Sequence, residues 1–267
     1  MNKQYVVLHK KIGETPLEAL AAWKKAHPEY ANTSASYAGR LDPMAEGKLL
    51  ILLGEECKRQ EKYTALDKEY EVEVLLDFSS DTGDVLGVPE YSRKETKVDS
   101  QVLGDVLRNE QGSHMRTYPA FSSKTVNGKP LFLYMLEGKI GEIEIPEHKE
   151  RIYALKHLGT ERISAASLHK RIQEMLAVAP RSDEPSKELG ADFRQDEIRK
   201  HWNTLFGVLP NREFVVLRLR VVCASGTYMR SLAGRIGEAL GTKALALSIK
   251  RTKIGRYFFG LWQLLYR

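Results

Sequence analysis

The stretch from residue 37 to residue 54 places one carboxylate on a stiff turn that leads directly into an apolar segment. Asp42 is followed by Pro43, and proline fixes its own φ and pushes the preceding residue toward extended geometry. The turn lies between Gly39 and Gly47, and only Leu and Ile occupy positions 49–53, a segment that we expect to be buried. Such a turn can aim a catalytic carboxylate, although an Asp before Pro also commonly bonds only to its own turn.

The composition predicts a folded protein with a basic surface. The chain has 267 residues, a formal net charge of +6 and 42% hydrophobic residues, which is enough apolar material for one large domain or two small ones. We expect a single domain and a monomer. A basic surface makes nucleic acid the first partner to consider, while the alternative is that the excess of Lys and Arg only keeps the protein soluble.

The cysteines and the amino-terminal residues predict a cytoplasmic protein without a metal site. Cys57 and Cys223 are far apart and belong to no Cys/His ligand cluster, so we expect neither a zinc site nor a disulfide framework. Residues 5–8 read as a strand rather than as a signal peptide. No apolar run is long enough to span a bilayer.

Hydrophobic periodicity predicts a mixture of helices and antiparallel strands. Thr15 and Pro16 form a helix start, and the helix that follows should end before Pro28. Other expected elements are a strand over 70–76 with a polar loop at 80–84, a helix around 102–107 and a strand over 214–223. The segment from about 164 to 206 differs in character and is expected to be a helical insertion, with a helix around 168–176, a charged loop at 180–185 and a second helix over 193–202.

Three further patterns carry residues suited to chemistry. Residues 222–231 read as a strand that turns through Ser-Gly into a helix, which puts Arg230 near a helix start, where it could hold a carboxylate or phosphate or simply lie on the surface. Tyr70 begins a strand and could serve only sheet packing. The turn-rich loop 119–130 offers Lys124 and Lys129 to phosphates.

The order of these patterns resembles that of the TruB-type pseudouridine synthases, the enzymes that modify uridine 55 in the tRNA T-loop. Residues 39–47, Gly-Arg-Leu-Asp-Pro-Met-Ala-Glu-Gly, resemble the catalytic Gly-x-Leu-Asp-Pro-x-Ala-x-Gly motif of that family. Four more segments resemble its other motifs: 11–15 its Lys-Pro-x-Gly-x-Ser/Thr motif, 68–70 with 80–84 its Lys-x-Tyr strand and Asp-Thr-x-Asp loop, 123–128 its Ser-Ala-x-Lys loop, and 226–230 its Gly-Thr-Tyr-x-Arg motif.

The resemblance implies an α+β pseudouridine synthase fold, in which a mixed, mostly antiparallel central sheet is flanked by helices and crossed by a basic cleft. It implies that Asp42 is the catalytic nucleophile, Tyr70 the active-site tyrosine and Arg230 the partner of the aspartate. Asp84 matches a second acidic partner of that arginine, and Tyr228 has a supporting place in the same motif. The reaction detaches uracil from ribose and rejoins it through C5 without a redox change, so no cofactor or metal is expected.

The resemblance also implies that the target base is flipped out of folded RNA, at a cost offset by stacking and phosphate contacts. Candidate RNA-binding residues are Tyr37, Arg40, Lys124, Lys129, Lys250 and Arg251.

The chain departs from the family pattern at several points. Tyr37 stands where the family usually has histidine, and Arg40 matches the wording of the related RluA-type synthases. The helical insertion is not typical, and no carboxy-terminal PUA-type RNA-binding domain is expected after residue 256. Two alternative functions therefore stay open: a tRNA-binding folding helper with dispensable catalysis, and a pseudouridine synthase acting on another RNA.

Overall fold

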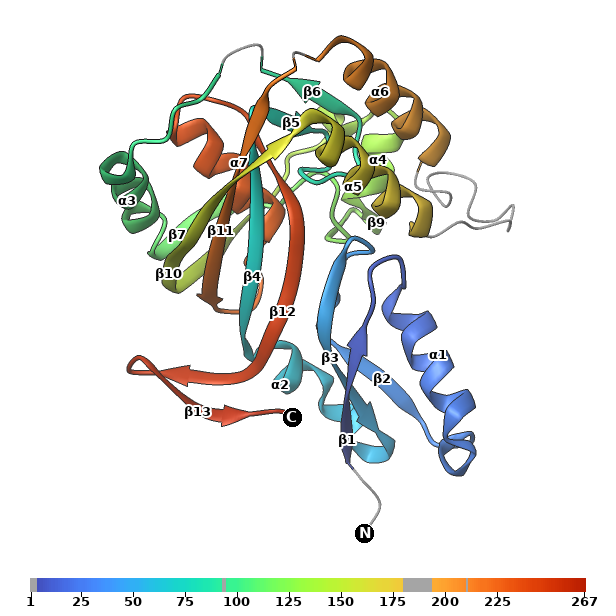
Figure 1. Cartoon of the computed structure of the whole chain (residues 1–267). Coiled ribbons are helices and arrows are strands. Elements are labelled where there is room, and N and C mark those ends of the chain that lie inside the picture. The colour runs from blue at the N-terminus through green and yellow to red at the C-terminus, as the bar shows by residue number, and fades with distance from the viewer. Residues whose placement is uncertain (1–3, 93–94, 180–193, 210) are drawn as a thin grey trace.

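The computed structural model describes residues 4–92, 95–179, 194–209 and 211–267. Their main feature is one large twisted sheet whose strands follow the order β1-β3-β12-β4-β11-β10-β7 (Figure 1), with β2 beside β3 and β13 beside β12. The strands of this sheet are β1 (Tyr5–Lys10), β2 (Ala35–Ala38), β3 (Ala45–Leu53), β4 (Asp67–Leu76), β7 (Gly112–Thr117), β10 (Glu147–Ser164), β11 (Glu213–Cys223), β12 (Ala244–Phe258) and β13 (Leu261–Leu265). Two short hairpins, β5 (Phe78–Ser80) with β6 (Pro89–Tyr91) and β8 (Thr125–Val126) with β9 (Lys129–Pro130), complete the strands.

The sheet is mixed because one strand pair runs parallel. β12 pairs with β3 in parallel over Ile249, Lys250 and Arg251, whereas the other ladders of the large sheet are antiparallel. This single pair joins two halves of the molecule, since β3 belongs with β1 and β2 while β12 also lies against β4. The predicted α+β architecture with a mixed, mostly antiparallel sheet is confirmed.

Helices cover the sheet and begin where the sequence provides caps. The Thr15 side chain accepts a bond from the Glu18 amide, and the Glu18 side chain accepts one from the Thr15 amide, which forms a capping box at the start of α1. The helices are α1 (Pro16–Ala26), α2 (Gln60–Thr64), α3 (Ser100–Asn109), α4 (Leu131–Leu136), α5 (Ala165–Val178), α6 (Gln195–Val208) and α7 (Met229–Ala239), with 3-10 turns η1 (Pro28–Tyr30), η2 (Gly54–Arg59) and η3 (Ile140–Glu142).

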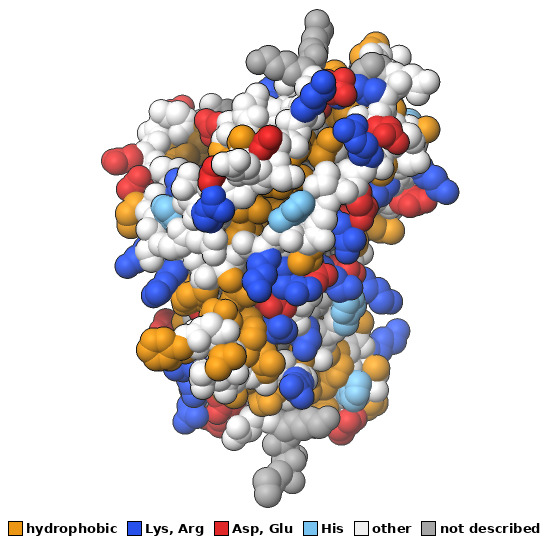
Figure 2. Space-filling model, turned by 60° about the vertical axis from the view of Figure 1, so that its left-hand side comes forward, with side chains coloured by type: hydrophobic (Ala, Val, Ile, Leu, Met, Phe, Trp, Pro, Cys, Tyr) orange, Lys and Arg blue, Asp and Glu red, His pale blue; other side chains and the backbone are white. Residues whose placement is uncertain are grey.

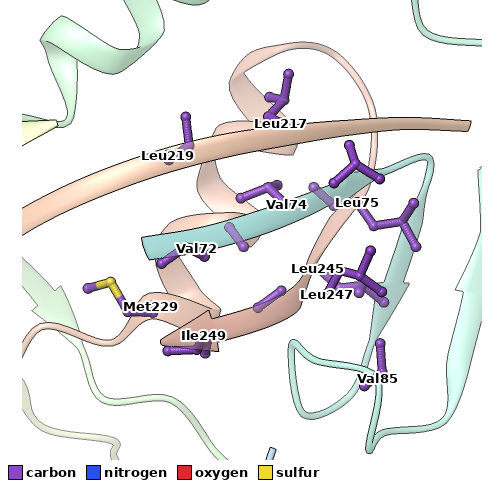
Figure 3. Packing of buried hydrophobic residues seen from close by; sticks show 14 of the residues in the cluster. Val72, Val74, Leu75, Val85, Leu217, Leu219, Met229, Leu245, Leu247 and Ile249 are labelled. Atoms are coloured by element: carbon purple, nitrogen blue, oxygen red, sulfur yellow. The ribbon is translucent and has the colours of Figure 1, made fainter. Parts of the chain in front are cut away.

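The largest hydrophobic core lies between the central strands and helix α7. Figure 3 shows apolar side chains lying close together on the neighbouring strands β4, β11 and β12, with Met229 at the start of α7 near them. Burial of this apolar surface is the main term that stabilises the fold. It also fixes the start of α7 against the sheet, which matters because Arg230 is the next residue.

Helices α5 and α6, in the segment predicted to be a helical insertion, pack against this same core. Leu168 and Ile172 of α5 and Trp202 of α6 are fully buried members of it. The predicted charged loop at 180–185 and the predicted helix start at Phe193 lie outside the described residues, and α6 begins at Gln195.

Charged side chains are unevenly spread over the surface. On the face shown in Figure 2, Lys and Arg side chains gather across the middle of the molecule, and an apolar group lies to their left. No helix of the described residues is long and apolar enough to cross a membrane.

Candidate active site

Asp42 lies in the loop between β2 and β3, and this loop is held from several directions. The Asp42 carbonyl accepts a bond from the Ala45 amide at 3.0 Å, and the Pro43 carbonyl accepts one from the Gly13 amide at 2.9 Å. Gly47 has φ +110°, and a Cβ there would lie 2.3 Å from the carbonyl oxygen of Arg251, so only glycine fits. The side chain of Asp42 is 43% exposed, which leaves its carboxylate open to a substrate.

Arg230 is the second residue of α7 and connects the Asp42 loop with two other loops. Its Nε donates to Asp42 Oδ2 at 2.8 Å, its Nη1 to the Thr82 carbonyl at 2.6 Å and its Nη2 to the Phe121 carbonyl at 3.0 Å. The Arg230 side chain is only 7% exposed. A guanidinium with this many fixed bonds is pre-organised, and it places a positive charge directly beside the Asp42 carboxylate.

A second carboxylate shares the same guanidinium. Asp84 Oδ2 lies 3.6 Å from Arg230 Nε, while Asp84 Oδ1 accepts bonds from the Thr82 hydroxyl and the Leu86 amide. Burial raises the pKa of Asp84 to about 6, although Arg230 acts in the opposite direction. The structure therefore brings together three of the predicted residues, Asp42, Asp84 and Arg230.

Two tyrosines lie within electrostatic range of Asp42. Tyr70 is on β4, opposite Val221 of β11 and Arg251 of β12, and is half-buried against the main core. Burial raises the pKa of Tyr70 although the Arg251 guanidinium acts in the opposite direction, and the charge of Asp42 adds a smaller rise. Tyr228 caps α7, and burial raises its pKa to about 12, again with a contribution from Asp42. Both phenols are therefore neutral near pH 7.

The structure corrects the prediction that Arg251 contacts RNA phosphate. Arg251 is 1% exposed, and its guanidinium donates to the carbonyls of Lys48 at 2.7 Å, Arg40 at 3.2 Å and Gly39 at 3.1 Å. The sequence could not show this, because Arg251 faces inward only through the parallel pairing of β12 with β3. These three bonds fix the backbone on both sides of Asp42.

Two buried lysines near this loop were not singled out from the sequence. Lys10 donates to the carbonyls of Ala45 at 2.6 Å and Pro43 at 3.4 Å, and burial lowers its pKa to about 8. Lys68 donates to the carbonyls of Thr64 and Leu66, and burial also lowers its pKa to about 8. Lys10 directly precedes the motif at 11–15, and Lys68 starts the Lys-x-Tyr motif. Their places in these motifs could have marked both lysines as candidate site residues.

The other predicted RNA contacts differ in their surroundings. The side chain of Arg40 is exposed, and Lys250 is 50% exposed with its Nζ 3.4 Å from Glu46 Oε1. Lys124 Nζ lies 5.1 Å from the centre of the Tyr118 ring. These three lysine and arginine side chains can still reach a phosphate, and their RNA contacts stay predictions.

Lys129 and Tyr37 have partners within the protein. Lys129 forms an ion pair with Glu137 and lies 4.7 Å from the Tyr134 ring, so its charge is already compensated. Tyr37 packs with the apolar cluster beneath α1, and its ring is only partly exposed. Base stacking by Tyr37 stays a prediction.

An aromatic group beside Tyr228 was not foreseen. The rings of Tyr118 and His148 are stacked with centroids 4.0 Å apart, and Tyr228 meets His148 edge-on at 5.7 Å. These residues come from segments far apart in the chain, which is why no local pattern indicated them. In the described part of the chain, no group of three or more His, Cys, Asp or Glu side chains could hold a metal ion.

Comparison with known proteins places the chain in a family. The model of the "TruB family pseudouridylate synthase (N terminal domain)" matches residues 28–173, which is more than half of the chain. The "tRNA pseudouridine synthase B" of Borreliella burgdorferi is 25% identical over 262 residues, covering 96% of this chain and 71% of the relative. The protein of the same name from Bacillus licheniformis is 27% identical over 253 residues, covering 94% of this chain and 65% of the relative.

A solved structure shares the fold. The crystal structure of a Cbf5-Nop10-Gar1 complex contains a chain that is 18% identical, with a TM-score of 0.54, and the match covers 94% of this chain and 48% of that chain. This chain therefore spans about half the length of that solved chain. The ordered motifs, the fold and the matched family model agree: the chain belongs to the TruB family of pseudouridylate synthases.

Proposed function

We propose that this protein is a pseudouridine synthase that acts on tRNA, with uridine 55 of the T-loop as its target and Asp42 as its nucleophile. The observation that carries the proposal is the pair formed by Asp42 and Arg230. A carboxylate that is 43% exposed accepts a 2.8 Å bond from a guanidinium that is almost fully buried. This arrangement combines a carboxylate that is oriented by a buried cation with access for a ribose.

The proposed reaction exchanges the N1–C1′ bond for a C5–C1′ bond and the C5 proton for a proton on N1. The N1–C1′ bond of uridine breaks while the Asp42 carboxylate attacks or stabilises the sugar carbon. The base then turns and a C5–C1′ bond forms, and any bond between the Asp42 carboxylate and C1′ breaks in the same step, which returns the free carboxylate. The C5 proton leaves, and N1 ends protonated. No electrons are gained or lost, so the chemistry needs only an anion, a group that holds the free base and a site that keeps it from escaping.

Tyr70 is proposed to hold the base. Its raised pKa keeps the phenol neutral near pH 7, so it can stack on the uracil and donate a hydrogen bond. A neutral phenol is a weak base, and the structure therefore favours holding over deprotonation as its role.

The proposal for the substrate rests on the names of the relatives and on the exposed cations. Both curated relatives are named tRNA pseudouridine synthase B. Arg40, Lys124 and Lys250 are proposed to contact the phosphates of the T-arm, since cations supply most of the affinity for RNA. The protein is further proposed to act as a monomer in the cytoplasm.

The test uses an unmodified tRNA transcript and a matched transcript in which uridine 55 is replaced by cytidine. After incubation with the purified protein, pseudouridine is mapped at single-nucleotide resolution. The proposal predicts one pseudouridine, at position 55 of the first transcript, and none in the second. Pseudouridine at other positions would contradict the T-loop target, and its absence from both would contradict the activity.

A further inference from the structure

Arg194, the residue before helix α6, contacts two loops that lie beside the candidate active site. Arg194 Nη1 forms an ion pair with Asp81 Oδ2 at 2.7 Å, and the Arg194 guanidinium lies 4.9 Å from the centre of the Phe121 ring. The side chains of Arg194 and Asp81 are 21% and 25% exposed, and the bond between them lies at the protein surface. One guanidinium therefore joins α6 to two loops of the site.

The same two loops hold Arg230. Arg230 donates to the carbonyls of Thr82, which follows Asp81, and of Phe121. Arg194 thus contacts these loops through side chains, and Arg230 contacts them through main-chain carbonyls. A displacement of either loop would move an acceptor of Arg230, whose third bond reaches the carboxylate of Asp42.

The loop that contains Asp81 is compact and is held by contacts between its own residues. Asp81 Oδ1 accepts a bond from the Val88 amide at 2.9 Å, and a Cβ on Gly87 would lie 2.5 Å from the same oxygen. Helix α6 is fixed to this loop a second time, because the indole of the fully buried Trp202 donates to the Val85 carbonyl at 3.0 Å. Asp81 is therefore a point through which α6 sets the position of residues 80–88.

We propose that Arg194 is a positioning residue of the active site, which fixes the loop at 80–88 and Phe121 so that Arg230 presents its Nε to Asp42. This inference rests on the proposed function and assigns the α5–α6 pair a role in it. The matched family model ends at residue 173, before α6 begins, so the contact comes from a part of the chain outside that match. Positioning of this kind affects rate more than affinity, because small displacements of reacting groups cost large factors.

The experiment compares Arg194→Met, Arg194→Lys and a control on the same helix. Arg199 donates to the Leu176 carbonyl of α5 at 3.1 Å, so Arg199→Met weakens the helix pair and has no direct partner in the loop. We expect Arg194→Met to lower kcat on the tRNA transcript at least about tenfold with KM within about twofold of wild type. Arg194→Lys should restore part of kcat because it keeps the ion pair with Asp81, and Arg199→Met should leave kcat within about twofold.

A second readout does not depend on activity. The Arg230 Nε–H signal in a ¹⁵N correlation spectrum, assigned through its loss in Arg230→Lys, reports the bond to Asp42. The proposal predicts that this signal shifts or broadens in Arg194→Met and stays in place in Arg199→Met. The proposal would be overturned if the Arg230 signal were unchanged in Arg194→Met, or if it changed while kcat stayed the same. It would also be overturned if Arg194→Met and Arg199→Met lowered kcat equally. If the wild-type protein proves inactive, the proposed function fails, and the spectrum alone then decides whether Arg194 positions Arg230.

Discussion

At the scale of single residues, the site depends on how one guanidinium is shared between two acids. Asp42 and Asp84 both face Arg230, but Asp42 is 43% exposed and Asp84 only 5%. Water can stabilise the charge of Asp42, whereas Asp84 loses that hydration, and its pKa rises to about 6. We therefore propose separate roles for the two carboxylates, with the exposed one facing the substrate and the buried one supporting the arginine.

The raised pKa of Asp84 predicts a pH dependence of stability. The folded protein binds this proton more tightly than the unfolded chain, so the contribution of Asp84 to the free energy of unfolding is fully present below about pH 4. It falls as the pH rises to about 6, by about 3 kcal/mol, and is constant above that. Asp84→Asn removes this dependence. Urea unfolding at pH 4.5 and 7 should show the stability of wild type relative to Asp84→Asn decreasing with pH, and an increase would contradict the assignment.

The residue scale is also where the sequence is most and least informative. Asp42, Asp84 and Arg230 belong to short local motifs, and the structure brings them together. The sequence predicts an RNA contact for Arg251 because a cation in a basic segment is usually exposed, but the direction of its side chain depends on a strand pairing that no local pattern encodes. Tyr118 and His148 were missed for the same reason, since their contact joins distant segments.

At the scale of elements, β12 fixes the catalytic loop through its parallel contact with β3. The strand is 15 residues long and was not identified from the sequence, because Lys250, Arg251 and Lys253 interrupt its apolar pattern. A central strand can hold these cations because Arg251 donates hydrogen bonds to three carbonyls and Lys253 pairs with Glu69. By contrast, α1, α3, β4 and β11 carry complete caps or regular alternation, and their existence was predicted.

Substitution of Arg251 should therefore destabilise the fold rather than weaken RNA binding alone. Arg251→Ala removes a fully buried side chain and leaves three partly buried carbonyl acceptors without their donor, and each such loss costs about 1–3 kcal/mol. Thermal and urea unfolding are expected to show a loss of about 3 kcal/mol or more, with a smaller loss for Arg251→Lys, which keeps one donor. Unchanged stability together with reduced RNA affinity would instead support a contact between Arg251 and RNA phosphate.

At the scale of the whole molecule, the central strands share the largest hydrophobic core with α5 and α6, whereas β1, β2 and most of β3 pack in two smaller clusters. A single catalytic domain stays a prediction, and the ladder between β3 and β12 that joins the two parts supports it. The sequence indicated the insertion through its composition but could not show where it docks. Docking depends on Trp202 and Arg194, whose partners Val85 and Asp81 lie more than a hundred residues earlier in the chain. Pairings at that separation leave no periodic pattern.

Exposed cations should govern RNA affinity across the surface, in contrast to the buried ones. Lys250→Ala removes a half-exposed charge, so we expect weaker tRNA binding, a slope of log affinity against log salt reduced by about 1, and an unchanged melting temperature. Lys58→Ala is the control, because Lys58 is 75% exposed on η2 and is not assigned to RNA. Equal effects of the two substitutions on the salt slope would show that Lys250 has no specific contact.

The central claim is that the Asp42 carboxylate performs the chemistry, and Asp42→Asn tests it while keeping the size of the side chain. The measurement is single-turnover release of tritium from tRNA labelled at uridine C5, at protein concentrations that saturate binding for wild type and variant alike. The account predicts that wild type releases tritium from one uridine per tRNA and that Asp42→Asn binds the same tRNA but releases none. Tritium release by Asp42→Asn at a rate close to that of wild type would contradict it.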